Sequence, residues 1–245
     1  GYSSAASDVY KRQLLKRYVF HESGTLVSGI IGGLYSSTAT ISVLARKSRK
    51  ASEQEATDYV AAMLLAVSMM FLRFMILILI FSREIFLSIY PYLLTMAVVA
   101  AIVAWFIHSR QKRPEDQPAE TEEDDSSNPL EFKVALIFAV LFVIFTFLTH
   151  YTLVYAGTGG LNLLSFVSGF SDITPFILNL LQNTGSVAAL IITACSMQAI
   201  ISNIMVNMFY ALFFAGKGSK LRPWILGGFG VVIACNLVLL LFFYI

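Results

Sequence analysis

The stretch YVAAMLLAVSMMFLRFMILILIF, residues 59–81, decides the class of fold. Apart from one arginine, Arg73, its side chains are uncharged and almost all apolar. A run of about 20 apolar residues is long enough to cross the hydrocarbon core of a bilayer as a helix. An ionisable residue at that depth is costly, and it usually faces a partner, a cavity or a transport path. The stretch therefore predicts a transmembrane helix with a polar site beside it.

The rest of the chain repeats this pattern. Of its 245 residues, 57% are hydrophobic and 13% are charged, and the charges gather in short stretches between apolar runs. Six further apolar segments cover residues 24–45, 85–107, 132–155, 159–182, 186–215 and 223–245. This composition excludes a soluble globular domain. It predicts an all-α, polytopic helical membrane protein with five to seven transmembrane helices.

The polar stretches suggest how the chain is divided. Residues 1–13 contain SAASDVYKRQ (4–13), which looks like a translated sequencing adapter, so we set them aside; the alternative is a genuine polar tail. Residues 14–245 would then form the membrane domain. A polar loop with eight acidic residues, 108–131, separates two halves at about 24–107 and 159–245. Segment 132–155 is the predicted linking helix.

The segment GTLVSGIIGGLYSSTATISVLA (24–45) carries signs of a break. Gly29 and Gly33 form a GxxxG pair that suits close helix packing, and hydroxyl residues follow them directly. Hydroxyls after a break can cap the next half-helix or line a site for an ion or polar solute. They can also bond back to their own helix, which is the structural alternative.

The segment GGLNLLSFVSGFSDITPFILNLLQ (159–182) is interrupted at Gly169, Asp172 and Pro175. Pro175 suits the first turn of a new helix, and Asp172 or Thr174 suits its N-cap. Asp172 is either only a cap or part of a site where a half-helix begins at membrane depth. Irregular backbone survives in a membrane only where protein or a water-filled cavity satisfies it.

Charge counting favours two re-entrant segments over two crossing ones. We leave out Lys11, Arg12 and Arg73, so fourteen basic residues remain. If both broken segments cross, the basic residues divide six against eight between the faces; if both re-enter, thirteen fall on one face and only Arg83 on the other. Basic residues favour the cytoplasmic side, so the re-entrant arrangement is preferred. It would also make the two halves inverted repeats, as in many transporters.

Two short similarities support an internal repeat. GLYSSTA (33–39) resembles GFSDITP (169–175), and VAAMLLAVSM (60–69) resembles VAALIITACSM (187–197). Chance similarity between apolar stretches is the alternative. The repeat predicts one broken segment followed by two full helices in each half.

The candidate site combines the two intramembrane charges with the polar side chains of the broken segments. Asp172 would bind a cation or relay protons, and Arg73 would pair with it or bind an anion. Asn203 and Asn207 share a helix face because they are four residues apart, and interhelical hydrogen bonding is their alternative role. The complete predicted set is Arg73, Asp172, Ser36, Ser37, Thr38, Thr40, Thr174, Asn203 and Asn207.

No motif indicates catalysis or a cofactor. The sequence has no phosphate-binding loop, no metal-spaced His/Cys cluster and no Ser/His/Asp arrangement, so we expect neither an enzyme nor a metal or other cofactor. We expect no nucleic acid partner. The expected surroundings are the lipid bilayer of a bacterial inner (plasma) membrane, and a homo-oligomer is compatible with the pattern.

At GLYSSTATISVLARKSR (33–49), MFLR (70–73) and NPLEF (128–132) the chain resembles a bacterial and archaeal membrane family, the domain of unknown function numbered 4010. The resemblance covers about residues 20–245. It implies an integral membrane protein whose biochemistry is unassigned. That domain commonly follows an MgtC/SapB domain, so an upstream domain of that type is the implied partner.

Two classes of function follow from these features. The first is a transporter or permease for an ion or small polar solute, with a polar site in mid-membrane. The second is a non-transporting regulatory or partner subunit of a membrane ion-homeostasis system, whose polar core is structural. A transporter needs a hydrated path from the site to each face, whereas a regulatory subunit would enclose it.

Overall fold

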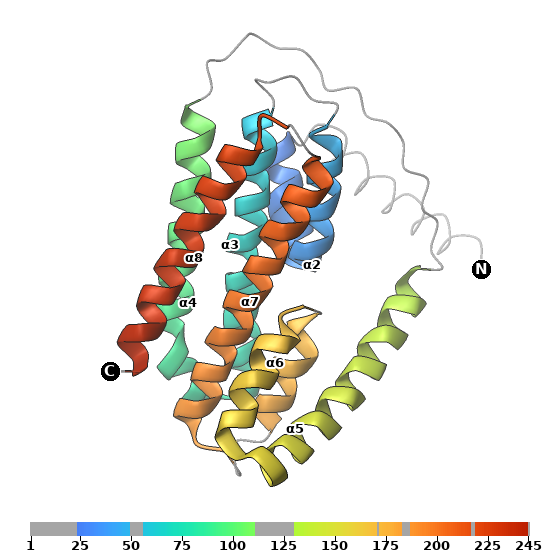
Figure 1. Cartoon of the computed structure of the whole chain (residues 1–245), viewed down its shortest axis with the longest axis vertical. Coiled ribbons are helices and arrows are strands. Elements are labelled where there is room, and N and C mark those ends of the chain that lie inside the picture. Colours follow the sequence, from blue (N-terminus) through green and yellow to red (C-terminus); the bar gives the residue numbers. More distant parts are fainter. Residues whose placement is uncertain are drawn as a thin grey trace, which may run out of the picture.

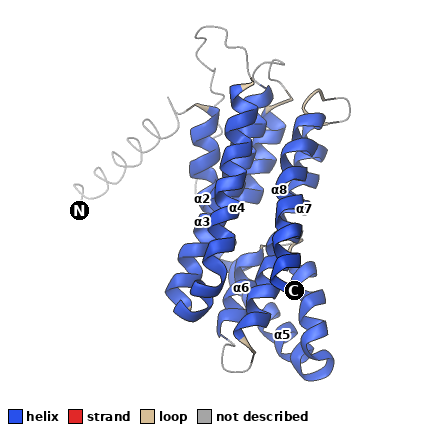
Figure 2. Cartoon of the chain, turned by 90° about the vertical axis from the view of Figure 1, so that its left-hand side faces the viewer, coloured by secondary structure: helices blue, strands red, loops and turns tan. Residues whose placement is uncertain are grey.

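A computed structural model describes residues 24–49, 56–110, 130–170, 172–182, 187–216 and 219–244. Within these ranges all regular secondary structure is helical, and short turns join the helices (Figures 1 and 2). The helices are α2 (Thr25–Lys47), α3 (Ala56–Phe81), α4 (Arg83–Ser109), α5 (Leu130–Ser168), α6 (Ile173–Gln182), α7 (Ala189–Ala215) and α8 (Arg222–Tyr244). The adapter-like residues 1–13 and most of the acidic loop lie outside the described residues.

The predicted class of fold is confirmed. Among the described residues, five helices are long and apolar enough to cross a membrane: α2, α3, α4, α7 and α8. Many large apolar side chains on these helices are exposed, Ile80 and Trp105 among them, as expected for surfaces that face lipid. Apolar side chains of all sizes fill the interior, including an unbroken buried run from Val60 to Leu64 on α3 and large rings such as Phe71.

One of these five helices, α2, is folded back on itself. Ser36 has an extended backbone (φ −156°, ψ 106°) that interrupts the helix. A Cβ atom added to Gly32 would collide with the side chain of Thr40. In a straight helix those two residues would be about 12 Å apart along the axis, so the chain must reverse between them. Residues 25–47 therefore form a helical hairpin, the first hairpin, as predicted for a re-entrant segment.

The first hairpin is fixed against α3 by its glycines. Gly29 lies on the backbone of Ala62, and Gly33 lies on Ala66, so closely that neither could carry a Cβ without displacement. The order of these contacts shows that the entering limb runs parallel to α3 and begins at the same end of the bundle. The returning limb then ends where α3 begins, which makes the segment re-entrant (Figure 1).

The second hairpin comprises Gly159–Ser168, at the end of α5, together with α6 (Ile173–Gln182). The predicted linking segment and the first half of segment 159–182 join as α5, with a sharp turn at Gly157 (φ 58°, ψ −149°). Glycine adopts this left-handed conformation without the steric cost of a Cβ. Returning α6 packs on the part of α5 before that turn, because Phe145 and Phe176 have ring centroids 5.6 Å apart.

The two halves have opposite orientations. Helix α3 runs from the upper end of Figure 1 to the lower and α4 returns, whereas α7 runs upward and α8 downward. The first hairpin enters from the upper end and the second from the lower end, so their tips approach each other at mid-height. This is the arrangement of an inverted repeat, in which each half has one hairpin and two long helices.

A constant offset in the sequence relates the halves. Gly33 lies on Ala66, 33 residues later, and Gly169 lies on Ser202, again 33 residues later. Both contacts are therefore related by the same 136 positions (169 − 33 and 202 − 66). This offset confirms the similarity between 33–39 and 169–175. Pairing 60–69 with 187–197 implies an offset of 127, which disagrees with the offset of 136 that relates Ala66 on α3 to Ser202 on α7. That alignment is therefore wrong.

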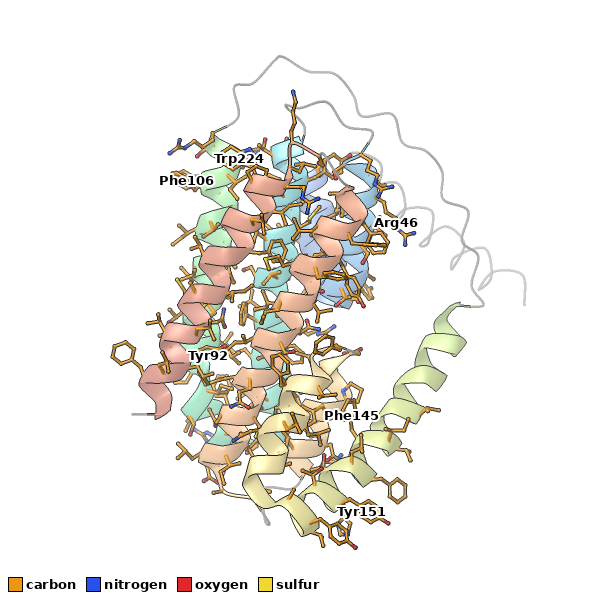
Figure 3. The ribbon with its side chains drawn as sticks, in the orientation of Figure 1. Arg46, Tyr92, Phe106, Phe145, Tyr151 and Trp224 are labelled. Carbon is orange, nitrogen blue, oxygen red and sulfur yellow. The ribbon has the colours of Figure 1, made fainter. Side chains whose placement is uncertain are left out.

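Aromatic and basic side chains mark the two ends of the bundle. Figure 3 shows Arg46, Phe106 and Trp224 near the upper end and Tyr151 near the lower end. Exposed aromatic residues at both ends are typical of the two interfaces of a membrane. Among described loops and helix ends, Arg46, Lys47, Arg49, Arg110, Lys220 and Arg222 lie at the end where α3 begins, whereas Arg83 lies at the opposite end. The prediction that one face is strongly basic holds for these residues.

Candidate functional site

A polar cavity of about 360 Å³ lies where the two hairpin tips meet α3 and α7. Its walls come from four places distant in the sequence. The first hairpin contributes Ser36, Ser37, Thr38, Ala39 and Ser42; α3 contributes Met70, Arg73 and Phe74; the second hairpin contributes Phe170, Asp172 and Ile173; and α7 contributes Asn203, Val206 and Tyr210.

Both hairpin tips are built as helix N-termini. In the first hairpin, the Ala39 backbone N–H donates to Ser36 Oγ (3.3 Å), which caps the returning half-helix. In the second hairpin, the Thr174 N–H donates to Asp172 Oδ1 (2.9 Å), which caps α6. Side-chain oxygens at this position satisfy backbone donors that the helix itself cannot. Each returning half-helix therefore begins at the cavity, with the positive end of its dipole towards it.

Arg73 connects the two hairpins. Its Nη1 donates to the carbonyl oxygen of Tyr35 in the first hairpin (2.7 Å), and its Nη2 donates to Thr174 Oγ1 in the second (2.9 Å). Its Nε is buried and has no hydrogen-bond partner. The guanidinium also lies 5.2 Å from the centroid of the Phe74 ring. Arg73 thus bridges the tips through two neutral acceptors, and its Nε is the one guanidinium nitrogen without a hydrogen-bond partner.

Asp172 lies on the same cavity as Arg73, but the two do not form an ion pair in this structure. Its carboxylate is exposed and bonds the Thr174 N–H as the cap of α6. The two predicted intramembrane charges are thus brought together by the fold, across a shared space and not in direct contact.

Helix α7 supports the second hairpin with amides and a hydroxyl. Asn203 Nδ2 donates to the carbonyl oxygen of Gly169 (3.2 Å), and Ser202 Oγ donates to that of Phe166 (2.7 Å). Asn207 Nδ2 donates to Asn203 Oδ1 (3.1 Å), so the two asparagines share one face as predicted. The buried Asn207 Oδ1 has no hydrogen-bond partner. These contacts satisfy the broken backbone at the second tip.

The structure places six of the nine predicted residues on the cavity wall: Ser36, Ser37, Thr38, Arg73, Asp172 and Asn203. The other three do not line the cavity but contact residues that are in or next to its wall. Thr40 Oγ1 donates to the Ser36 carbonyl (2.8 Å) and lies against Gly32, so it closes the hairpin. Thr174 holds the guanidinium of Arg73, and Asn207 orients Asn203.

Several lining residues were missed from the sequence, chiefly Ser42, Phe170 and Tyr210. Helix spacing could have found two of them, since Ser42 follows Thr38 by four residues and Tyr210 follows Asn203 by seven. Phe170 has no such signal, because an aromatic residue in an apolar segment looks like ordinary core.

The lining itself is nearly two-fold symmetric. Four pairs of lining residues are related by the offset of 136: Ser36 with Asp172, Ser37 with Ile173, Met70 with Val206, and Phe74 with Tyr210. Each pair occupies the same place in its half, and Ser36 and Asp172 are both N-caps. The charges break the symmetry, because Arg73 corresponds to Phe209. Equivalent positions thus carry different chemistry around one space.

Together these features define a multi-pass helical membrane protein with an inverted repeat and two re-entrant hairpins that meet at a polar cavity. A sequence model of the family described as "Domain of unknown function (DUF4010)" matches residues 11–215, and the chain belongs to this family. An uncharacterized protein of Aquifex aeolicus (strain VF5) is 24% identical over 224 residues, which cover 89% of this chain and 94% of that protein. No solved structure matches the chain.

Proposed function

We propose that this chain is a transporter or permease for an ion or small polar solute, and that the cavity between the hairpin tips is its binding site. The observation that carries the proposal is the meeting of two oppositely oriented hairpins at one polar cavity about midway along the helical bundle. Inverted repeats with broken helices at the midplane are the recurring design of secondary transporters.

The arrangement of the hairpins suits alternating exposure of such a site. Each hairpin enters from a different face, so movement of either tip would open the cavity towards that face only. Arg73 is the described side chain that bonds to both tips at once.

We propose that the basic end of the bundle lies in the cytoplasm and that the protein resides in the plasma membrane.

Thiol accessibility tests this proposal. We would introduce Ser37→Cys into a background in which Cys195 and Cys235 are replaced by alanine, because both are free thiols. Inverted and right-side-out vesicles would then be treated with a charged, impermeant methanethiosulfonate. We expect Ser37→Cys to react from both faces, because a transporter exposes its site alternately.

Ser68→Cys is the matched control, since Ser68 lies on α3, is buried, and bonds the Ala97 carbonyl of α4 (2.8 Å) away from the cavity. It should react from neither face. If Ser37→Cys also reacts from neither, the core is sealed and the protein is a regulatory or partner subunit. Reaction from one face alone, in all energised and de-energised conditions, would also contradict transport.

A further inference from the structure

Arg73 is a half-buried charged group on α3 that forms no ion pair among the described residues. Its two terminal nitrogens donate to a carbonyl and a hydroxyl oxygen, which are neutral, and its buried Nε has no partner. A charge in a low-dielectric interior is normally paired, because desolvation costs several kcal/mol that neutral acceptors offset only in part. Asp172, which lines the same cavity, attracts this guanidinium only across the open space, so no described anion is in contact with it.

The cavity beside Arg73 has the features that an anionic group needs. The first turns of two half-helices line it, through Ser37 and Thr38 on one side and Ile173 on the other. Helix N-termini favour negative charge, and hydroxyl side chains supply further donors. The guanidinium supplies the full positive charge and directional hydrogen bonds that suit carboxylates.

Size and charge narrow the class of ligand. A cavity of about 360 Å³ is at the small end of ligand sites, which favours a solute of few heavy atoms. Asp172 supplies a carboxylate on the same wall, and it would repel a second negative charge on the ligand. Apolar side chains, Met70, Phe74 and Val206, leave room for a hydrocarbon part.

We propose that the cavity binds a small solute with one carboxylate group, held by Arg73 between the two hairpin tips. This inference rests on the proposed transport function and specifies its substrate class. A simple monocarboxylate and a zwitterionic amino acid share this chemistry. They differ at Asp172, which would repel the former and attract the ammonium group of the latter.

Thermal unfolding of the purified protein in lipid nanodiscs tests the assignment. The probes are sodium acetate, L-alanine and sodium succinate, with sodium chloride at matched ionic strength as reference. We expect acetate or alanine to raise the unfolding temperature by about 2–4 °C at saturation, and succinate to raise it less. Arg73→Gln should abolish the rise, and Arg83→Gln, at the start of α4 and outside the cavity lining, should retain it.

Asp172→Asn separates the two forms of ligand and keeps the fold, because asparagine caps a helix as well as aspartate does. If the ligand is a monocarboxylate, the variant should bind acetate more tightly, by about tenfold; if it is an amino acid, the variant should lose the alanine response. If Arg73→Gln does not fold, Arg73→Lys is used in its place. It should weaken carboxylate binding, because lysine lacks the planar guanidinium group that donates two parallel hydrogen bonds to a carboxylate.

Three results would overturn the inference. They are no response of the wild-type protein to any carboxylate, a response that survives in the Arg73 variant, or a response to sodium ions alone. If any of these occurs while Ser37→Cys is still labelled from both faces, transport stands and only the substrate class is wrong. If Ser37→Cys is labelled from neither face, both proposals fail.

Discussion

At the scale of the residue, the central contact is the bridge that Arg73 forms between the hairpins. A hydrogen bond to a charged donor contributes about 1.5–3 kcal/mol, more than a bond between neutral groups. Arg73 and Asp172 could be predicted as site residues because an ionisable side chain is unmistakable in an apolar run. Their hydrogen-bond partners could not, since the acceptor in the first hairpin is a backbone carbonyl, that of Tyr35, which any residue could supply.

Thr174→Val tests this bridge. The substitution keeps the shape of the side chain but removes the oxygen that accepts from Arg73 Nη2. We expect the free energy of unfolding to fall by about 1.5–3 kcal/mol, because a guanidinium donor is left unsatisfied. Thr95→Val is the matched control: Thr95 is exposed and its hydroxyl bonds only the Pro91 carbonyl of its own helix (2.6 Å). Equal losses in thermal stability for the two variants would show that the bridge contributes nothing.

At the scale of the element, each hairpin depends on a glycine that allows the backbone of the next helix to approach. The breaks could be predicted from residue type, because glycines followed by hydroxyl residues, or by Asp172 and Pro175, disfavour a continuous helix. The site of the first break differs from the glycines themselves, since the backbone leaves the helical conformation at Ser36. The glycines instead provide packing surface. The turn at Gly157 falls in the gap between the predicted segments 132–155 and 159–182, so this boundary could be predicted from the sequence.

Substitutions of single glycines by alanine distinguish packing from helix propensity. A Cβ at Gly33 would overlap Ala66, and one at Gly169 would overlap Ser202, so both variants should lower the free energy of unfolding by about 1–3 kcal/mol. At Gly227 and Gly230 of α8 nothing lies within 4 Å of an added Cβ. Alanine there should leave stability unchanged or raise it by about 0.5–1 kcal/mol. If all four variants unfold alike, the glycines do not hold the hairpins.

At the scale of the whole molecule, the inverted repeat explains why residues so distant in the sequence form one site. Because the halves have opposite orientations, their hairpins enter from opposite faces and can meet only tip to tip. The distribution of basic residues predicted this topology, since it depends on loops and not on the weak signal of apolar similarity. The register of the repeat could be found only in part from the sequence. One apolar residue can replace another in α3 and α7 without changing the fold, so the similarity between 60–69 and 187–197 gave the wrong alignment. The tip residues 33–39 and 169–175 must form a break in the helix, and they were aligned correctly.

The re-entrant, inverted topology is the central claim, and the sidedness of single cysteines tests it most directly. In the background without Cys195 and Cys235, cysteine would replace Gly24, Arg49, Gln182 or Lys220, one at a time. An impermeant thiol reagent would then be applied to one face of intact vesicles. We predict that Gly24, Arg49 and Lys220 are labelled from the same face and Gln182 from the opposite face. Labelling of Gly24 and Arg49 from opposite faces, or of Gln182 and Arg49 from the same face, would show that the hairpins cross the membrane and would contradict the account.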